Sequence, residues 1–208
     1  MPKQNDGSRI TTAVPDTTAL KALAHPDRLR LLGLLRYGGP DTASGLARRL
    51  GLNSGATSYH LRQLADYGFI EQATEIGNKR ERWWRARHDV TQTDPAEMEG
   101  ERLEAGLAMV QAVLSQHAAL MQRALQQFPQ QPAEWRKASN ASDYTFALTA
   151  EQALALKEKL VGLLWEEMRR SPPSDAPLAP GTRKFMVMLH TFPFPGFGLS
   201  GDPANGTD

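Results

Sequence analysis

Two amphipathic helical patterns, in residues 42–50 and 54–67, are separated by only three residues. Gly51 ends the first pattern with a residue suited to a helix C-terminus, and Asn53 is a favourable N-cap for the second. Two helices joined by so short a turn form a helix-turn-helix. The second helix has one face with i, i+3, i+4 and i+7 spacing, made of Thr57, His60, Leu61 and Leu64.

Two further helices are expected before this pair, and a hairpin after it. Asp16 or one of the two threonines after it caps a short helix, and Pro26 begins a leucine-rich helix that a glycine pair stops. Gly68 ends the fourth helix. Residues 69–71 and 82–87 then have the composition of two strands, with turn residues between them. Four helices followed by a basic hairpin predict a winged helix-turn-helix.

Residues 17–88 resemble a known protein family. The stretch LARRLGLNSGATSYHLRQLADYGFI (Leu46–Ile70), preceded by LKALAHPDRLRLLGLL (Leu20–Leu35), closely resembles the arsenic-repressor (ArsR) type of bacterial transcriptional regulators over residues 17–88. The resemblance implies a dimeric, sequence-specific DNA-binding regulator, by family default a repressor, whose recognition helix Ser54–Tyr67 enters the major groove of a double-stranded operator. It also implies that Ser54, Ser58 and Tyr59 touch DNA, Tyr59 at either a base or a phosphate.

The predicted wing, Gly77–Arg87, concentrates positive charge. Five of the nine residues from 79 to 87 are basic, and Glu81 is the only opposite charge near them in the sequence. Such a wing holds phosphates or enters the minor groove; the alternative is a solvated charged hairpin. Gly55, in the first turn of the recognition helix, indicates either a close backbone approach to DNA or sequence drift. The candidate DNA-binding residues are Asn53, Ser54, Ser58, Tyr59, Arg62, Gln63, Lys79, Arg80 and Arg82.

The net charge of +1 hides an asymmetry along the chain. Residues 1–88 hold fourteen basic and eight acidic residues, a net charge of +6. The remaining ten basic and fifteen acidic residues give residues 89–208 a net charge of −5. This division predicts two modules, of which the first meets a polyanion.

The chain lacks the residues that several functional classes of protein need. The chain has no cysteine, which excludes disulfides, a thiolate nucleophile and a cysteine-based metal site. Its five histidines are dispersed and are expected to be structural, so neither a metal nor another cofactor is predicted. The sequence contains no phosphate loop, no nucleophile elbow and no paired carboxylates, so an enzyme is not predicted. The sequence has no apolar segment long enough to indicate a membrane span or a secretion signal, so a cytoplasmic protein is expected.

A long helix is expected after the wing, because residues 96–128 contain no proline. Its apolar residues follow the 3-4 spacing of a helix seam. A helix in this position is what the ArsR type uses to form a homodimer, which would set two recognition helices on half-sites about one DNA turn apart. The alternative is a helix that packs only against its own chain. The candidate dimerisation residues are Leu107, Val110, Leu114, His117, Met121 and Phe128.

The remainder of the chain carries no motif with an assigned function. Two apolar extended runs, residues 144–148 and 183–192, flank a helix that begins with a capping box at Thr149 and Gln152. A strand–helix–strand module is therefore expected, with the second strand buried or paired at an interface. Its aromatic and methionine residues could line a pocket for an unidentified small-molecule effector, or form the ordinary core of a small domain that extends the dimer.

The predicted fold class is mainly α with small β. It comprises a winged helix-turn-helix domain (16–90), a long dimerisation helix (91–130) and a small C-terminal α+β module (131–195), between a disordered arm (1–15) and a disordered tail (196–208). The expected function is transcriptional regulation through specific DNA binding. The alternative is a protein-interaction scaffold that uses the winged helix without specific DNA readout.

Overall fold

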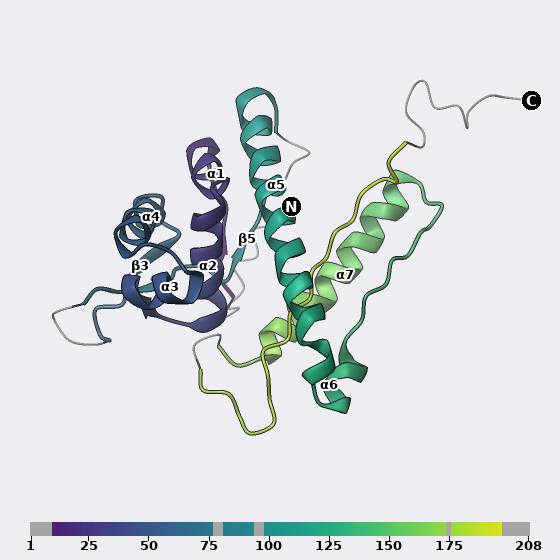
Figure 1. Ribbon diagram of the computed structural model, residues 1–208. Helices are drawn as coiled ribbons and strands as arrows, with labels where there is room; N and C mark the ends of the chain where they lie inside the picture. Colours follow the sequence, from purple (N-terminus) through teal and green to yellow (C-terminus); the bar gives the residue numbers. More distant parts are fainter. Residues whose placement is uncertain (1–9, 77–80, 94–97, 174–175, 197–208) are drawn as a thin grey trace, which may run out of the picture.

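The computed structural model describes residues 10–76, 81–93, 98–173 and 176–196, and it is mainly helical with two small sheets, as predicted (Figure 1). The helices α1 to α4 gather at one end of the molecule, and α5 runs from them toward α6 and α7. The helices are α1 (Thr17–Leu23), α2 (Pro26–Gly38), α3 (Ala43–Leu50), α4 (Ser54–Asp66), α5 (Gly100–Gln127), the 3-10 helix η2 (Phe128–Gln130), α6 (Ala133–Ala138) and α7 (Ala150–Arg170). Among the described residues, none of these helices is both long and apolar enough to cross a membrane.

The core of the winged helix-turn-helix domain is built mainly from leucines whose spacing in the sequence predicted that they are buried. Asp16, Thr42 and Asn53 accept backbone hydrogen bonds at the N-termini of α1, α3 and α4, as predicted. Gly51 closes α3 in the left-handed conformation, with φ of 67°. These local signals fix where each helix begins and ends, so the apolar stripes meet in one core. Its most buried large side chains include Leu20, Leu23, Leu31, Leu32, Leu35, Leu46, Leu61, Leu64, Phe69 and Ile70.

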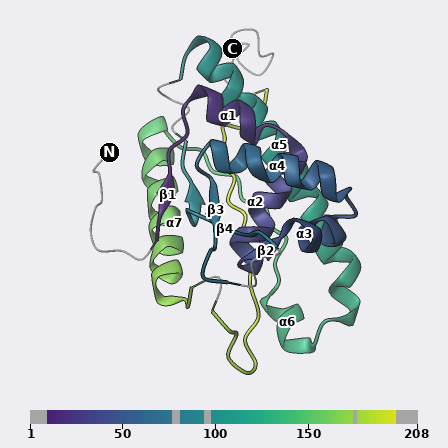
Figure 2. The same cartoon turned by 90° about the vertical axis from the view of Figure 1, so that its left-hand side faces the viewer.

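A three-stranded antiparallel sheet with the order β2-β4-β3 completes this domain. The predicted hairpin is present as β3 (Ile70–Gln72) and β4 (Trp83–Ala86), with Glu71 opposite Arg85. The strand β2 (Asp41–Thr42) pairs with the other edge of β4 and was not predicted. Figure 2 shows β3 and β4 lying against the helical layer that contains α2 and α4. The sheet thereby anchors the base of the wing to the core.

The expectation of a disordered arm over residues 1–15 is wrong for its last part; residues 1–9 lie outside the described structure. The strand β1 (Thr12–Ala13) pairs in parallel with β5 (Val90–Thr91), and Ala13 is buried. Thr11 holds the pair in place, because its backbone N–H donates to Asp89 Oδ2 (2.8 Å) and its carbonyl accepts from the Asp89 N–H (2.9 Å). The sequence has no local signal for a pairing between residues almost eighty positions apart.

The helix α5 confirms the predicted long helix, and its two sides differ. Ala105, Met109 and Ala112 are buried where α5 packs against α1 and α2. The helical period places the predicted seam on the opposite side, where Leu107 is 59% exposed and Leu114 is 42% exposed. Packing against the winged helix-turn-helix domain is thus confined to one side of α5, whereas on the other side His117 contacts His190 of the same chain at 2.9 Å. The seam we refer to below consists of Leu107, Val110, Leu114, His117, Met121 and Phe128.

The C-terminal module contains the expected helix but not the expected strands. The capping box of Thr149 and Gln152 begins α7, as predicted. The runs at 144–148 and 183–192 form no strand, because no strand among the residues that the structure describes lies beside them. Tyr144 and Phe146 are 73% and 60% exposed, so these two side chains are not part of a buried core in the described structure. The last residues of the predicted tail, 197–208, lie outside the described structure.

Candidate nucleic-acid interface

The helix α4 is fixed by its buried side and leaves its other side open. Thr57, Leu61 and Leu64 are each fully buried, as the spacing predicted. Thr57 satisfies its hydroxyl group by donating to the Asn53 carbonyl oxygen (2.9 Å). The Asn53 side-chain oxygen accepts from the backbone N–H groups of Gly55 (2.8 Å) and Ala56 (3.3 Å). The first turn of α4 is therefore held rigidly by its own cap.

The structure gives Gly55 a further reason besides the two that the sequence suggested. A Cβ atom at this position would lie 3.1 Å from Oδ1 of Asn53, the capping atom. That distance is shorter than ordinary van der Waals contact. A larger residue would therefore push against the cap, so the glycine accommodates the capping interaction.

The candidate residues on α4 point away from the core. Tyr59 is 51% exposed, and its ring meets the edge of the His60 ring with centroids 5.5 Å apart. Ser54 and Arg62 are also exposed, whereas Ser58 and Gln63 are half-buried. The part of the helix nearest its N-terminus thus presents hydroxyl groups and a phenol, with a guanidinium one turn further along. These groups can hydrogen-bond to base edges or phosphates.

A groove brings together three elements that the sequence placed apart. Its lining includes Ser44 from the first turn of α3, Ser58 and Arg62 from α4, and Arg82 and Trp84 from the wing. The N-terminus of α3 adds a partial positive charge to two guanidinium groups. Sequence reasoning did not include Ser44, although its place in the first turn of α3 was predicted. Glu81 also lines the groove and offsets one of the two guanidinium charges, while the hydroxyl groups and the remaining positive charge are suited to a phosphate backbone.

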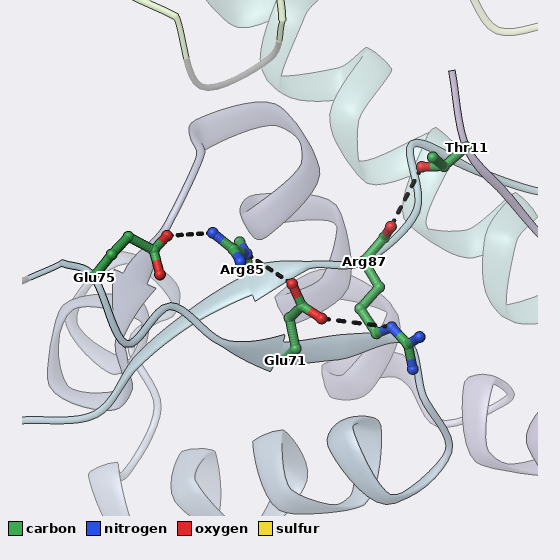
Figure 3. Close-up of polar contacts among 5 residues, drawn as sticks. All are labelled: Thr11, Glu71, Glu75, Arg85 and Arg87. Atoms are coloured by element: carbon green, nitrogen blue, oxygen red, sulfur yellow. Dashed lines mark hydrogen bonds and ion pairs between the residues drawn. The ribbon is translucent and has the colours of Figure 1, made fainter. Parts of the chain in front are cut away.

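The positive charge of the wing is smaller than the sequence indicated. Arg85 donates through Nε to Glu71 Oε1 (2.8 Å) and through Nη1 to Glu75, and Arg87 Nε lies 3.6 Å from Glu71 Oε2 (Figure 3). The reading of Glu81 as the only nearby opposite charge is thus wrong, because the register of the hairpin sets Glu71 opposite Arg85. Arg82 is exposed beside the groove, and the predicted contacts Lys79 and Arg80 lie outside the described residues.

The fold brings together histidines that are far apart in the sequence. His25 and His60 have ring centroids 4.5 Å apart, which links the start of α2 to the recognition helix. His25 is also the N-cap of α2, since its Nδ1 accepts from the Asp27 N–H (3.2 Å). The expectation of satisfied histidines does not hold for His60, whose buried Nδ1 has no hydrogen-bond partner within the described part of the chain.

His25, Asp27 and His60 place one potential ligand atom each within 4.8 Å of one another. A cation at this cluster would conflict with the cap. The neutral His25 ring that accepts at Nδ1 carries its proton on Nε2, so metal binding at either nitrogen would remove the hydrogen bond from Asp27. This geometry favours a structural role for the cluster over a metal site.

Acidic conditions are expected to destabilise the protein through three half-buried histidines. Burial is the main cause that lowers the pKa of His60, His88 and His117 below the ordinary value of 6.5. The unfolded rings gain protons as the pH falls through 6.5 while the folded rings stay neutral, so stability is present above this pH and is lost below it. Urea denaturation at pH 7.5 and pH 5.5 measures the loss. A His60→Gln variant should lose less stability over the same interval, and equal losses in both proteins would contradict this role of His60.

The paired helices α3 and α4 and the hairpin packed beside them define a winged helix-turn-helix protein. Residues 23–73 match the family described as a helix-turn-helix domain. The chain is also similar to the HTH-type transcriptional regulator YgaV of Escherichia coli K12, with 47% identity over 53 residues. This match covers 25% of the chain and 52% of YgaV, so the chain spans about half the length of this relative.

Among solved structures, the chain is similar to the homodimeric winged helix-turn-helix DNA-binding domain of Mb0332 from Mycobacterium bovis, determined by NMR as fragment 1–100. The two share 26% identity over 49% of this chain and 82% of the other, with a TM-score of 0.31. The match to the helix-turn-helix family falls within the domain formed by α1 to α4 and the sheet.

Proposed function

We propose that this protein is a dimeric transcriptional regulator of the ArsR type that binds a specific double-stranded DNA sequence and represses transcription. The observation that carries the proposal is the groove where the outward side of α4, the start of α3 and Arg82 of the wing meet. In this arrangement α4 enters the major groove while Ser44 and Arg82 hold the flanking phosphates. The similarity to a transcriptional regulator supports the same function.

Dimerisation through α5 belongs to the same proposal. The exposed seam lies on the side of α5 that faces away from its own winged helix-turn-helix domain. A second copy that covers the seam would leave both recognition helices free. A two-fold dimer of this kind matches the two-fold symmetry of a palindromic operator. Leu107, Leu114 and Met121 would form the centre of this interface.

A salt series tests whether the wing binds phosphates. The affinity of the full chain for its own upstream DNA is measured by mobility shift at several salt concentrations. Arg82→Ala is expected to weaken binding to all sequences and to lower the salt slope by about one unit, because one phosphate contact is lost. The matched control is Arg123→Ala, which removes an exposed arginine from α5. Equal slopes for Arg82→Ala and the wild-type chain would remove Arg82 from the interface, and an unchanged slope in Arg80→Ala as well would remove the wing.

A change of sequence preference separates specific readout from simple positioning. Ser58→Ala and Tyr59→Phe alter groups on the outward side of α4 without touching its buried side. Each is expected to shift which operator variant binds best, with a penalty of about 1–3 kcal/mol for the affected base pair. A scaffold without specific readout predicts no preference among sequences in either the wild-type chain or the variants.

A further inference from the structure

We infer that residues 139–173 and 176–192 form a single layer with the same residues of a second copy, in which the extended runs 144–148 and 185–192 hydrogen-bond as strands to the partner. The inference deepens the proposed function, because it names the surface that completes the dimer. It does not depend on DNA binding. The winged helix-turn-helix domain would be one unit and this two-chain layer the other.

The first support is the lack of a core in this half of the chain. The described residues include 24 exposed large apolar side chains, of which four precede residue 100 and twenty follow it. Neither α6 nor α7 has a buried residue. Ordinary side-chain areas give these twenty residues together roughly 2,000 Å² of exposed apolar surface, spread over α5, α7 and the extended segments. A partner that packs on these elements would cover much of it.

The second support is the backbone. Figure 1 draws residues 139–149 and 183–196 as long extended traces. Within the described structure, residues 144–148 and 185–192 form no backbone hydrogen bond to any part of the chain. Extended backbone with apolar side chains requires partners for its N–H and C=O groups once water is excluded. A second copy offers two segments of the same kind, so strand pairing satisfies both chains at once.

The third support is the way the second extended run is held. His190 Nε2 lies 2.9 Å from His117 Nδ1 on the seam of α5, which fixes this run beside the proposed dimer helix. Because side chains alternate along an extended chain, Leu189 and Val187 point away from α5. Val187 is 57% exposed and Phe185 is 58% exposed. The run therefore presents an apolar row that its own chain does not cover.

The size and continuity of this surface favour a second copy over an unrelated protein. The run contacts the α5 seam through His190 and His117, so a partner that packs on the exposed part of the seam also reaches the outward row of the run. Obligate homodimers bury about 2,000–5,000 Å² in total and are mainly apolar, which agrees with the exposed surface in each chain. A two-fold arrangement also pairs each apolar row with a row of the same composition.

Hydrogen exchange of the full chain tests the inference. Size-exclusion chromatography with light scattering gives the mass, and mass spectrometry gives the amide exchange rates of residues 144–148 and 185–192. We expect a dimer in which both runs exchange at least about 100-fold more slowly than an unstructured chain. Val187→Asp is expected to abolish this protection and to raise the dimer dissociation constant at least about 10-fold. The matched control Val187→Thr, which keeps the branched shape, should retain protection.

Three measurements separate unfolding, loss of the strand pairing and loss of DNA binding: exchange in α2 and α4, exchange in the two runs together with the mass, and mobility shift. Amides of α2 and α4 that remain protected in Val187→Asp show that its effect is not unfolding. A dimer whose two runs exchange as fast as an unstructured chain would overturn the inference, and so would a monomer at all concentrations. Mobility shift with operator DNA is measured in parallel. DNA binding without protected runs overturns only this inference, whereas protected runs without DNA binding overturn only the proposed regulator.

Discussion

Replacing Leu61 with alanine is expected to lower the free energy of unfolding by about 2–5 kcal/mol. Leu61 is fully buried on the inward side of α4, where it belongs to the same core cluster as Leu31 and Trp84. Alanine favours helix, so the loss would come from the cavity and the missing apolar contacts and not from helix propensity. Because domains of this size are stable by only about 5–15 kcal/mol, the change would remove a large part of the stability.

Urea denaturation followed by circular dichroism measures this loss. Arg62→Ala is the matched control, because it changes the next residue of the same helix to the same residue type, but at an exposed position. Its effect on stability is expected to stay within about 0.5 kcal/mol. A loss below about 1 kcal/mol for Leu61→Ala would mean that α4 is not docked on the core as described.

Replacing Leu114 with aspartate is expected to raise the dimer dissociation constant at least about 100-fold and to weaken binding to a two-half-site operator by about 10²–10⁴-fold. Leu114 lies at the middle of the seam and is 42% exposed in the single chain, so the substitution is compatible with folding of the monomer. In the proposed dimer the new carboxylate would lie at an apolar interface, where an unpaired charge is costly. Loss of the dimer removes the benefit of binding two half-sites together.

Analytical ultracentrifugation and mobility shift measure the two effects. The matched control is Gln122→Asp, which places the same charge on α5 at an exposed position whose neighbours three and four residues away are not seam residues. This control is expected to remain a dimer and to bind DNA as tightly as the wild-type chain. A Leu114→Asp protein that stays dimeric at low concentration would place the dimer interface elsewhere.

The parts of the fold that could be predicted depend on neighbours in the sequence. The caps at Asp16, Thr42 and Asn53 and the capping box at Thr149 were each visible as a residue type at a defined position. The leucine spacing then fixed which side of each helix is buried. For these reasons the winged helix-turn-helix and the long helix followed from the sequence without tertiary information.

The parts that could not be predicted depend on residues far apart. The pairing of β1 with β5 rests on Thr11 and Asp89, and neither residue type signals a strand by itself. The runs at 144–148 and 183–192 have strand-like composition but no neighbouring strand within the described part of the chain, so they form no strand in the single chain. Strand formation requires a partner as well as a pattern.

The candidate site shows the same division. The outward position of Tyr59 and Arg62 follows from the helical period, so sequence reasoning could find these residues. The neutralisation of Arg85 by Glu71 and Glu75 depends on the register of the hairpin, which the sequence does not specify. For this reason a count of basic residues overstated the charge that the wing offers to DNA.

Selection from a random pool of double-stranded DNA tests the central claim most directly, because it asks whether the chain reads a sequence at all. The full chain is expected to enrich a sequence with two related half-sites whose centres lie about 10–10.5 base pairs apart, or a multiple of this distance. The enriched sequence should differ for the Tyr59→Phe variant. A pool that remains random after repeated selection, although the folded chain is present as a dimer, would contradict the assignment of this protein as a sequence-specific regulator.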